Sequence, residues 1–201
     1  MKLDPFYLIV DSAAWVERLV PLGVKLVQLR IKDLDEASLR REIRVSKGIC
    51  EGHGCQLIVN DYWRIAIEED CDFVHLGQED LAGADVEAIR RAGLKLGLST
   101  HDEAELETAL QAKPDYVALG PIYPTILKAM KWAPQGLDRI TPWKQRIGRL
   151  PLVAIGGLTV ERIAGVFAQG AASAAVVTDI TRNVHPEART LEWLAATAPW
   201  R

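Results

Sequence analysis

The sequence of 201 residues predicts one eight-stranded (β/α) barrel, and three observations support this fold class. Eight short apolar runs, rich in β-branched residues, recur along the chain. Each run is continuously apolar rather than alternating, as is typical of parallel strands buried on both faces. Helical patterns separate the runs, and no linker divides the chain, so we expect a single domain over residues 1–201. Eight units of about 25 residues are near the lower size limit of the barrel. A doubly wound open sheet is the alternative.

Each predicted strand has the length of a buried strand. In chain order they are Phe6–Val10, Val24–Leu29, Gln56–Val59, Phe73–Leu76, Leu94–Leu98, Tyr116–Leu119, Leu152–Ile155 and Ser173–Val177. Between them, apolar residues at helical spacing predict helices over Ala13–Leu22, Glu36–Gly48, Tyr62–Glu69, Ala84–Ala92, Asp102–Ala112, Thr159–Gln169 and Pro186–Ala196. Thr159 is typical of an N-cap, and Gly170 closes the helix that it begins.

Composition narrows the class of protein. The chain is 49% hydrophobic and 25% charged with a net charge of −3, which excludes wholesale disorder and gives no reason to expect nucleic acid or a membrane as partner. No apolar run reaches about 18 residues, and the first ten residues lack a signal-peptide pattern. The cysteines Cys50, Cys55 and Cys71 form no CxxC pair, so we expect free thiols and a cytoplasmic location.

Polar side chains gather where the predicted strands end, which is where barrel enzymes place their active sites. Gln28, Arg30 and Lys32 alternate along one strand end and therefore point to the same side. Two cations beside an amide suit a phosphate or another charged leaving group. A solvated strand end with ion pairs is the alternative.

Two carboxylates follow neighbouring strands. Asp61 and Asp80 come after the third and fourth strands, so we expect them to lie near each other. Mg²⁺ typically takes one or two protein carboxylates together with substrate phosphates, which predicts a magnesium site, with Glu79 as a second choice of ligand. The alternative is that Asp61 caps a helix and Asp80 caps a turn.

The longest loop follows the sixth strand, over about residues 120–138. It carries Thr125 and Lys128, and a long loop at this end of a barrel is typical of a substrate clamp. Gly156-Gly157 after strand seven and Val177-Thr178 after strand eight stand where barrels often bind phosphate through backbone N–H groups. An exposed lysine and a simple glycine turn are the alternatives.

Two histidines are candidates for acid–base chemistry, and three tryptophans are candidates for an interface. His75 and His101 are acid–base candidates, but His75 lies inside an apolar run and His101 precedes a helix start, so a core histidine and a helix cap are the alternatives. Trp132, Trp143 and Trp200 are candidates for an exposed interface, which leaves a homodimer open, and the alternative for Trp132 is that it belongs to the long loop as part of a lid.

These segments together resemble one family. The motifs are Gln28-Leu29-Arg30-Ile31-Lys32, Asn60-Asp61, His75-Leu76-Gly77-Gln78-Glu79-Asp80, Ser99-Thr100-His101, Gly120-Pro121-Ile122-Tyr123-Pro124-Thr125 with Lys128, and Ile155-Gly156-Gly157-Leu158. In this order they are similar to thiamine phosphate synthase, over nearly the whole chain. The resemblance implies a (β/α)8 barrel that joins hydroxymethylpyrimidine pyrophosphate to thiazole phosphate and releases pyrophosphate.

The resemblance also implies a role for each site residue. The residues that would hold the pyrimidine pyrophosphate are Gln28, Arg30, Lys32 and Asn60. Asp61 and Asp80 would bind Mg²⁺. Arg30, Ser99 and Lys128 would act in catalysis around the departing pyrophosphate. The thiazole phosphate would be held by Thr125, Gly157, Val177 and Thr178.

Three places depart from the family pattern, and at one of them Thr178 follows strand eight where the family usually has Ser. Ile126-Leu127 stands between Thr125 and Lys128 where the family has a further hydroxyl, and Asp179 follows Thr178 where a small residue is common. An acidic side chain beside a phosphate repels it unless it is turned away or paired. A thiazole tautomerase of the same superfamily and a non-catalytic barrel that binds thiamine phosphate therefore remain alternatives.

Overall fold

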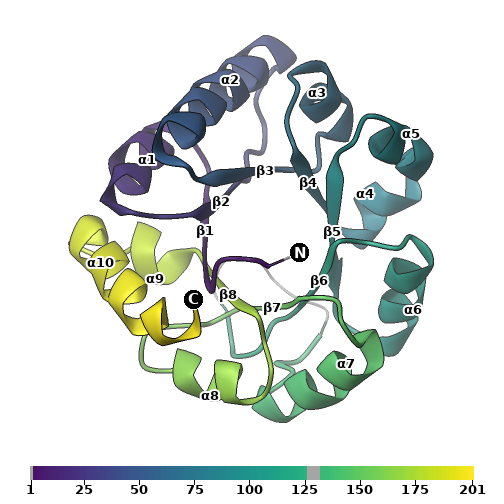
Figure 1. Cartoon of the computed structure of the whole chain (residues 1–201), viewed down its shortest axis with the longest axis vertical. Coiled ribbons are helices and arrows are strands. Elements are labelled where there is room, and N and C mark those ends of the chain that lie inside the picture. Colours follow the sequence, from purple (N-terminus) through teal and green to yellow (C-terminus); the bar gives the residue numbers. More distant parts are fainter. Residues whose placement is uncertain (1, 126–131) are drawn as a thin grey trace.

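Eight parallel strands close into a barrel in the computed structural model, which describes residues 2–125 and 132–201 (Figure 1). Each strand pairs with the next along the chain, and β8 pairs with β1. The strands are β1 (Phe6–Val10), β2 (Leu26–Leu29), β3 (Gln56–Asn60), β4 (Phe73–Leu76), β5 (Lys95–Thr100), β6 (Tyr116–Leu119), β7 (Leu152–Ile155) and β8 (Ser173–Val176). The predicted barrel is confirmed, and the open sheet is excluded by its closure.

The helices surround the barrel on its outside (Figure 1). They are α1 (Ala13–Leu19), α2 (Glu36–His53), α3 (Trp63–Glu68), α4 (Gln78–Ala82), α5 (Val86–Arg91), α6 (Glu103–Gln111), α7 (Ile140–Ile147), α8 (Ile163–Ala168), α9 (Thr178–Thr181) and α10 (Pro186–Thr197). Short 3₁₀ segments are η1 (Val20–Leu22), η2 (Leu137–Arg139) and η3 (Ala198–Trp200). The short helices α4 and α9 follow β4 and β8 directly, and the sequence did not predict them.

Two hydrophobic clusters hold this arrangement together. One fills the space between strands and helices, where side chains such as Val16, Ile43 and Trp193 are fully buried. The other fills the barrel interior and includes Tyr7 and Tyr116. Leu3, ahead of β1, is also buried in this inner cluster, so the amino-terminal segment packs against the interior of the barrel.

Helix α2 extends past the predicted end at Gly48. Its buried stripe continues to Cys50, so packing carries the helix through the glycine despite its low helix propensity. The helix ends instead at Gly54, whose φ of 59° lies in the left-handed region that glycine favours.

Helix α8 starts later than the sequence predicted, and Thr159 is not its N-cap. The backbone carbonyl of Thr159 accepts a hydrogen bond from Arg162 N at 3.0 Å, which forms a turn before the helix. The Arg162 guanidinium donates to the carbonyl of Gly157, which ties the turn to the loop after β7. The helix therefore begins only at Ile163.

The expectation that Trp143 lies at an exposed interface is wrong. Its side chain is buried, and its indole N–H donates to the Thr100 hydroxyl, which it reaches from α7 at 3.1 Å. Trp200 is exposed and stacks on Phe167. Trp132 is half-buried and lines the cavity described below.

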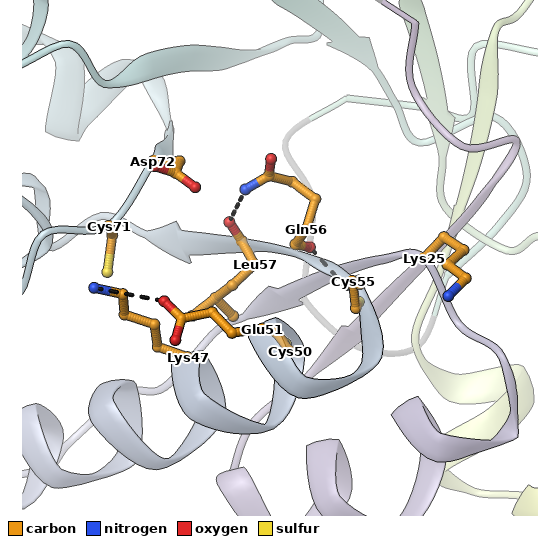
Figure 2. A pocket seen from close by; sticks show the side chains of 10 residues that line it. Lys25, Lys47, Cys50, Glu51, Cys55, Gln56, Leu57, Cys71 and Asp72 are labelled. Atoms are coloured by element: carbon orange, nitrogen blue, oxygen red, sulfur yellow. Dashed lines mark hydrogen bonds and ion pairs between the residues drawn. The ribbon is translucent and has the colours of Figure 1, made fainter.

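The three cysteines are free thiols around a second pocket of about 320 Å³ (Figure 2). This pocket lies at the amino ends of the strands, since Gln56 begins β3 and Asp72 precedes β4. Burial raises the pKa of the Cys71 thiol to about 11, so it is protonated at neutral pH. Among the helices described, none is long and apolar enough to cross a membrane.

Candidate active site

A cavity of about 860 Å³ opens at the carboxyl ends of the strands. Every sequence-predicted site residue in the described part of the chain lines it, and these residues are Gln28, Arg30, Lys32, Asn60, Asp61, Asp80, Ser99, Thr125, Gly157, Val177 and Thr178. Lys128 lies outside the described residues. The barrel thus brings together residues from the ends of seven different strands, β2 to β8, as expected for an active site of this fold.

The second strand supplies a row of three polar side chains at increasing distance from the barrel interior. Gln28 is buried, Arg30 is half-buried and Lys32 is exposed, and all three line the cavity. The Arg30 backbone N–H donates to Val10 O at 2.8 Å, which continues the pairing of β2 with β1 beyond the end of β2. The predicted alternation is confirmed: these side chains share one side of the strand.

Asp61 sits at a sharp turn after β3. Its φ of 66° lies in the left-handed region, which aspartate tolerates better than most residues. The turn brings its carboxylate to 2.5 Å from the Lys32 ammonium, and the side chain of Asp61 is only 11% exposed. A non-glycine residue held in this conformation is a recurrent feature of functional sites.

Asp80, in the first turn of α4, lines the same cavity as Asp61 and lies close enough for the two carboxyl groups to interact. Partial desolvation, followed by the negative charge of Asp61, raises the pKa of the Asp80 carboxyl, and the Lys32 ammonium opposes that rise. The predicted proximity of the two carboxylates is therefore confirmed. Their repulsion leaves a local excess of negative charge that a cation would relieve.

This donor set fits Mg²⁺ better than a metal that needs an all-protein cage. In the described ranges, no group of three or more His, Cys, Asp or Glu side chains is placed to hold a metal. Two neighbouring carboxylates in a cavity that also holds cations match the usual Mg²⁺ arrangement, in which water and substrate phosphates complete the shell. Glu79 also lines the cavity.

Gly156 and Gly157 let two loops pack backbone to backbone. Both have positive φ, and an added Cβ would come within 2.6 Å of Pro121 at Gly156 and within 2.5 Å of the Pro124 carbonyl at Gly157. The N–H of Tyr123 donates to Gly156 O at 3.0 Å. Only glycine fits these positions, and their contacts hold the segment that leads to Thr125 over the cavity.

Asp179 does not face the cavity. Its carboxylate accepts hydrogen bonds from Arg189 Nε at 2.8 Å and from Trp193 Nε1 at 2.7 Å. The side chain is only 14% exposed and is paired with a guanidinium of α10. The repulsion that the sequence suggested for a phosphate near Thr178 is therefore removed by pairing.

The two histidines both have structural partners and both line the cavity. His75 is buried and hydrogen-bonded to Tyr116 and Ser99, and burial lowers its pKa to about 4. His101 binds the Glu105 carboxylate at 2.7 Å and stacks on Trp132. Asp102, not His101, caps α6, by accepting a hydrogen bond from the N–H of Glu105.

Sequence reasoning missed Tyr7 and Tyr116, whose hydroxyls meet at 2.9 Å inside the barrel. A tyrosine within an apolar strand is easily taken for a core residue. The sequence does contain an indication of this cluster: Tyr7, His75 and Tyr116 all lie within predicted strands, and the barrel turns all three inward.

Comparisons with known proteins show which family this chain is similar to. A family model described as thiamine monophosphate synthase matches residues 6–180. A thiamine-phosphate synthase of Rhizobium etli is 73% identical over 201 residues, which is 100% of this chain and 98% of the relative. A thiamine-phosphate synthase of Enterobacter sp. is 45% identical over 192 residues, which is 96% of this chain and 88% of the relative.

Among solved structures, thiamine phosphate pyrophosphorylase from Pyrococcus furiosus superposes with a TM-score of 0.87 at 22% identity, covering 98% of this chain and 96% of that one. Fold, cavity and relatives define an enzyme of thiamine biosynthesis, a transferase built on a (β/α)8 barrel. The chain belongs to the thiamine monophosphate synthase family. The resemblance stated from its motifs is thereby confirmed.

Proposed function

We propose that this enzyme joins hydroxymethylpyrimidine pyrophosphate to thiazole phosphate, forming thiamine phosphate and pyrophosphate. The observation that carries the proposal is the single cavity lined by all eleven described residues that the motifs assign to this reaction. A cavity of about 860 Å³ lies within the range of about 300–1,000 Å³ typical of small-molecule sites.

We assign the pyrimidine ring to the buried amides of Gln28 and Asn60, which are 3% and 5% exposed. Arg30 and Lys32 lie nearer the mouth, where their charges suit a pyrophosphate that extends from the ring. The row thus orders the first substrate with its uncharged ring inside and its charged tail outside. Ser99 lines the same cavity and contacts the pyrophosphate in this scheme.

We propose that Asp61 and Asp80 hold Mg²⁺. The neighbouring carboxylates and the raised pKa of Asp80 support a cation at this place. Bound there, Mg²⁺ would supply positive charge to the oxygens of the pyrophosphate. The Lys32 ammonium lies 2.5 Å from Asp61 and neutralises part of the same negative charge in the protein without metal.

The second substrate fits the other side of the cavity. Thr125, Gly157, Val177 and Thr178 line it from the loops after β6, β7 and β8, and we assign the thiazole phosphate to them. Lys128 is assigned to the departing pyrophosphate, within an active-site loop of about residues 120–138. The pairing of Asp179 with Arg189 supports a phosphate here, since it neutralises a carboxylate that would otherwise oppose the phosphate.

The chemistry that these groups support is loss of pyrophosphate before the new bond forms. The pyrimidine-methyl cation that remains is captured by the thiazole nitrogen. Such a reaction needs stabilised leaving-group charge and aligned rings rather than a general base. His75 fits this account, because a histidine with a pKa of about 4 is a weak base at neutral pH.

The charged residues that line the cavity, Arg30, Lys32, Asp61 and Asp80, favour the synthase over the tautomerase and over a non-catalytic barrel. A thiazole tautomerase handles no pyrophosphate and has no use for the cations and paired carboxylates of this cavity. A barrel that only binds thiamine phosphate needs no site for a metal and a leaving group. We further propose a cytoplasmic location, which the three free thiols support.

The test is pyrophosphate release by the full chain, with each substrate alone and with both, with and without Mg²⁺. We expect release only with both substrates and Mg²⁺, and a loss of at least about 100-fold in Arg30→Ala and in Asp61→Ala. Arg41→Ala is the matched control, because Arg41 is exposed on α2 outside the cavity. Full activity in both site variants would overturn the assignment. Interconversion of thiazole isomers without Mg²⁺ would favour the tautomerase.

A further inference from the structure

A chain of hydrogen bonds between side chains crosses the floor of the cavity. Gln28 Nε2 donates to Tyr7 Oη at 2.8 Å, and Tyr7 Oη lies 2.9 Å from Tyr116 Oη. Tyr116 Oη lies 2.7 Å from His75 Nδ1, and His75 Nε2 lies 2.8 Å from Ser99 Oγ. The chain therefore links two residues assigned to the substrate, Gln28 and Ser99, through three that the reaction scheme does not use.

The three middle members are neutral at physiological pH. Burial raises the pKa values of Tyr7 and Tyr116 well above the usual value for a tyrosine, and an imidazole with its ordinary pKa of about 6.5 is already mostly uncharged above pH 7. Each tyrosine thus carries one proton on its oxygen, and the imidazole carries one proton on one of its two nitrogens.

The direction of each hydrogen bond follows from counting these protons. The Gln28 amide donates an N–H to the Tyr7 oxygen, so the Tyr7 hydroxyl must donate its own proton to a different partner. In the part of the chain that the structure describes, the Tyr7 hydroxyl has one further partner, Tyr116, which therefore accepts. Tyr116 then donates its own proton to His75 Nδ1, and His75 carries its proton on Nε2 and donates to Ser99 Oγ.

We propose that Tyr116 and His75 are positioning residues that orient the Ser99 hydroxyl as a hydrogen-bond donor toward the cavity. With its oxygen occupied by the His75 N–H, Ser99 keeps its own proton for a substrate. The oxygens of a phosphate accept hydrogen bonds and cannot donate them when ionised, so an anion gains from this polarity. The opposite polarity would direct the serine proton to His75 and leave a lone pair facing the anion. This inference rests on the proposed contact of Ser99 with pyrophosphate.

Gly97 makes the chain possible. The strand register sets His75 beside Gly97 and Gly97 beside Tyr116, so the glycine lies between the two partners. A Cβ on Gly97 would lie 2.2 Å from Tyr116 Cζ, because the tyrosine ring occupies that space. The missing side chain on β5 therefore lets Tyr116, on β6, reach His75, on β4.

The first test measures the tautomer of His75 directly in the substrate-free protein. Full-length protein labelled with ¹⁵N-histidine is studied by long-range ¹H–¹⁵N correlation NMR at neutral pH, and the His75 signals are those absent from His75→Gln. We expect the Nε2–H tautomer. A predominant Nδ1–H tautomer would overturn the proposal, whatever the activity of the enzyme.

The second test is kinetic. Tyr116→Phe removes one hydroxyl, and we expect kcat to fall about tenfold with KM for the pyrimidine substrate changed less, because the lost bond acts on a leaving group that gains charge. His75→Gln keeps an N–H where Nε2 donates and should retain much more activity than His75→Leu. Tyr62→Phe is the control, since its hydroxyl lies outside the chain, and it should match the wild type.

The kinetic results distinguish a failure of the positioning role from a failure of the proposed reaction scheme. Full activity of Ser99→Ala would remove Ser99 from the site and leave the tautomer result to stand alone. An impaired Ser99→Ala together with wild-type rates in Tyr116→Phe and His75→Leu would refute the positioning role. Equal rates in His75→Gln and His75→Leu would also refute it.

Discussion

Replacement of Gly97 by alanine is expected to disturb the centre of the barrel. The added Cβ would lie 2.2 Å from Cζ, 2.3 Å from Cε1 and 2.5 Å from Oη of Tyr116. Carbon atoms in contact normally stay about 3.5 Å apart, so the ring must shift by about 1 Å or more. Such a shift stretches the hydrogen bonds of 2.9 Å to Tyr7 and 2.7 Å to His75 beyond normal length.

The expected cost is the sum of two effects. Overpacking of a well-filled core costs about 1–3 kcal/mol, and each of the two buried hydrogen bonds contributes about 1 kcal/mol. The free energy of unfolding of Gly97→Ala should therefore be about 3–5 kcal/mol lower than that of the wild type. Formation of thiamine phosphate should also fall, because the same shift releases His75 from Tyr116.

Urea unfolding followed by far-UV circular dichroism measures this loss. The matched control is Gly48→Ala, a glycine within α2 whose added Cβ would meet nothing within 4 Å. Alanine should stabilise the helix there by up to about 1 kcal/mol. If Gly97→Ala unfolds at the wild-type urea concentration, the steric reasoning fails. It fails equally if the control loses as much stability as Gly97→Ala.

Three further predictions concern single side chains. Asp179→Ala leaves the Arg189 guanidinium without its most buried partner and should lower the free energy of unfolding by about 1–3 kcal/mol, measured by urea unfolding; an unchanged midpoint would contradict this. Folding lowers the pKa of His75 from about 6.5 to about 4, so the folded protein binds this proton less readily than the unfolded chain. The contribution of His75 to the free energy of unfolding is therefore complete above pH 6.5. It is lost as the pH falls toward 4, and the loss amounts to about 3 kcal/mol. His75→Gln should remove that part of the pH dependence between pH 7 and 5, and an equally steep loss in the variant would show that another group is responsible. Asp80→Asn removes the repulsion between the carboxylates of residues 80 and 61, so at pH 7 without metal the variant should have a higher melting temperature than the wild type. It should also lose Mg²⁺-dependent turnover. A lower melting temperature would refute the repulsion.

Local sequence patterns predict the strands well, because each is a short continuous apolar run and the barrel buries every one of them. The cavity could be predicted for the same reason. Once the strands are placed, the polar residues that follow them, such as Arg30 and Asp61, must meet at one end of the barrel.

What the sequence could not predict depends on tertiary contacts. Tyr7 and Tyr116 are 109 residues apart, and only barrel closure brings their hydroxyls together. The sequence suggested that Asp179 would repel a phosphate, because its partner Arg189 lies on the next helix and the pairing is not visible in the sequence. The sequence suggested that Trp143 is exposed, but α7 packs against β6 and β7 and places the indole beside a buried acceptor, the Thr100 hydroxyl.

The pairing of β1 with β8 bears on how the chain is made. Phe6 is the register partner of Ala174, and Trp193 of α10 stacks on the Phe6 ring at 5.6 Å. During synthesis, one edge of β1 therefore stays unpaired until β8, the last strand of the barrel, has left the ribosome. An exposed strand edge invites association with other chains, so the interval before closure is when a nascent barrel of this design is most open to aggregation.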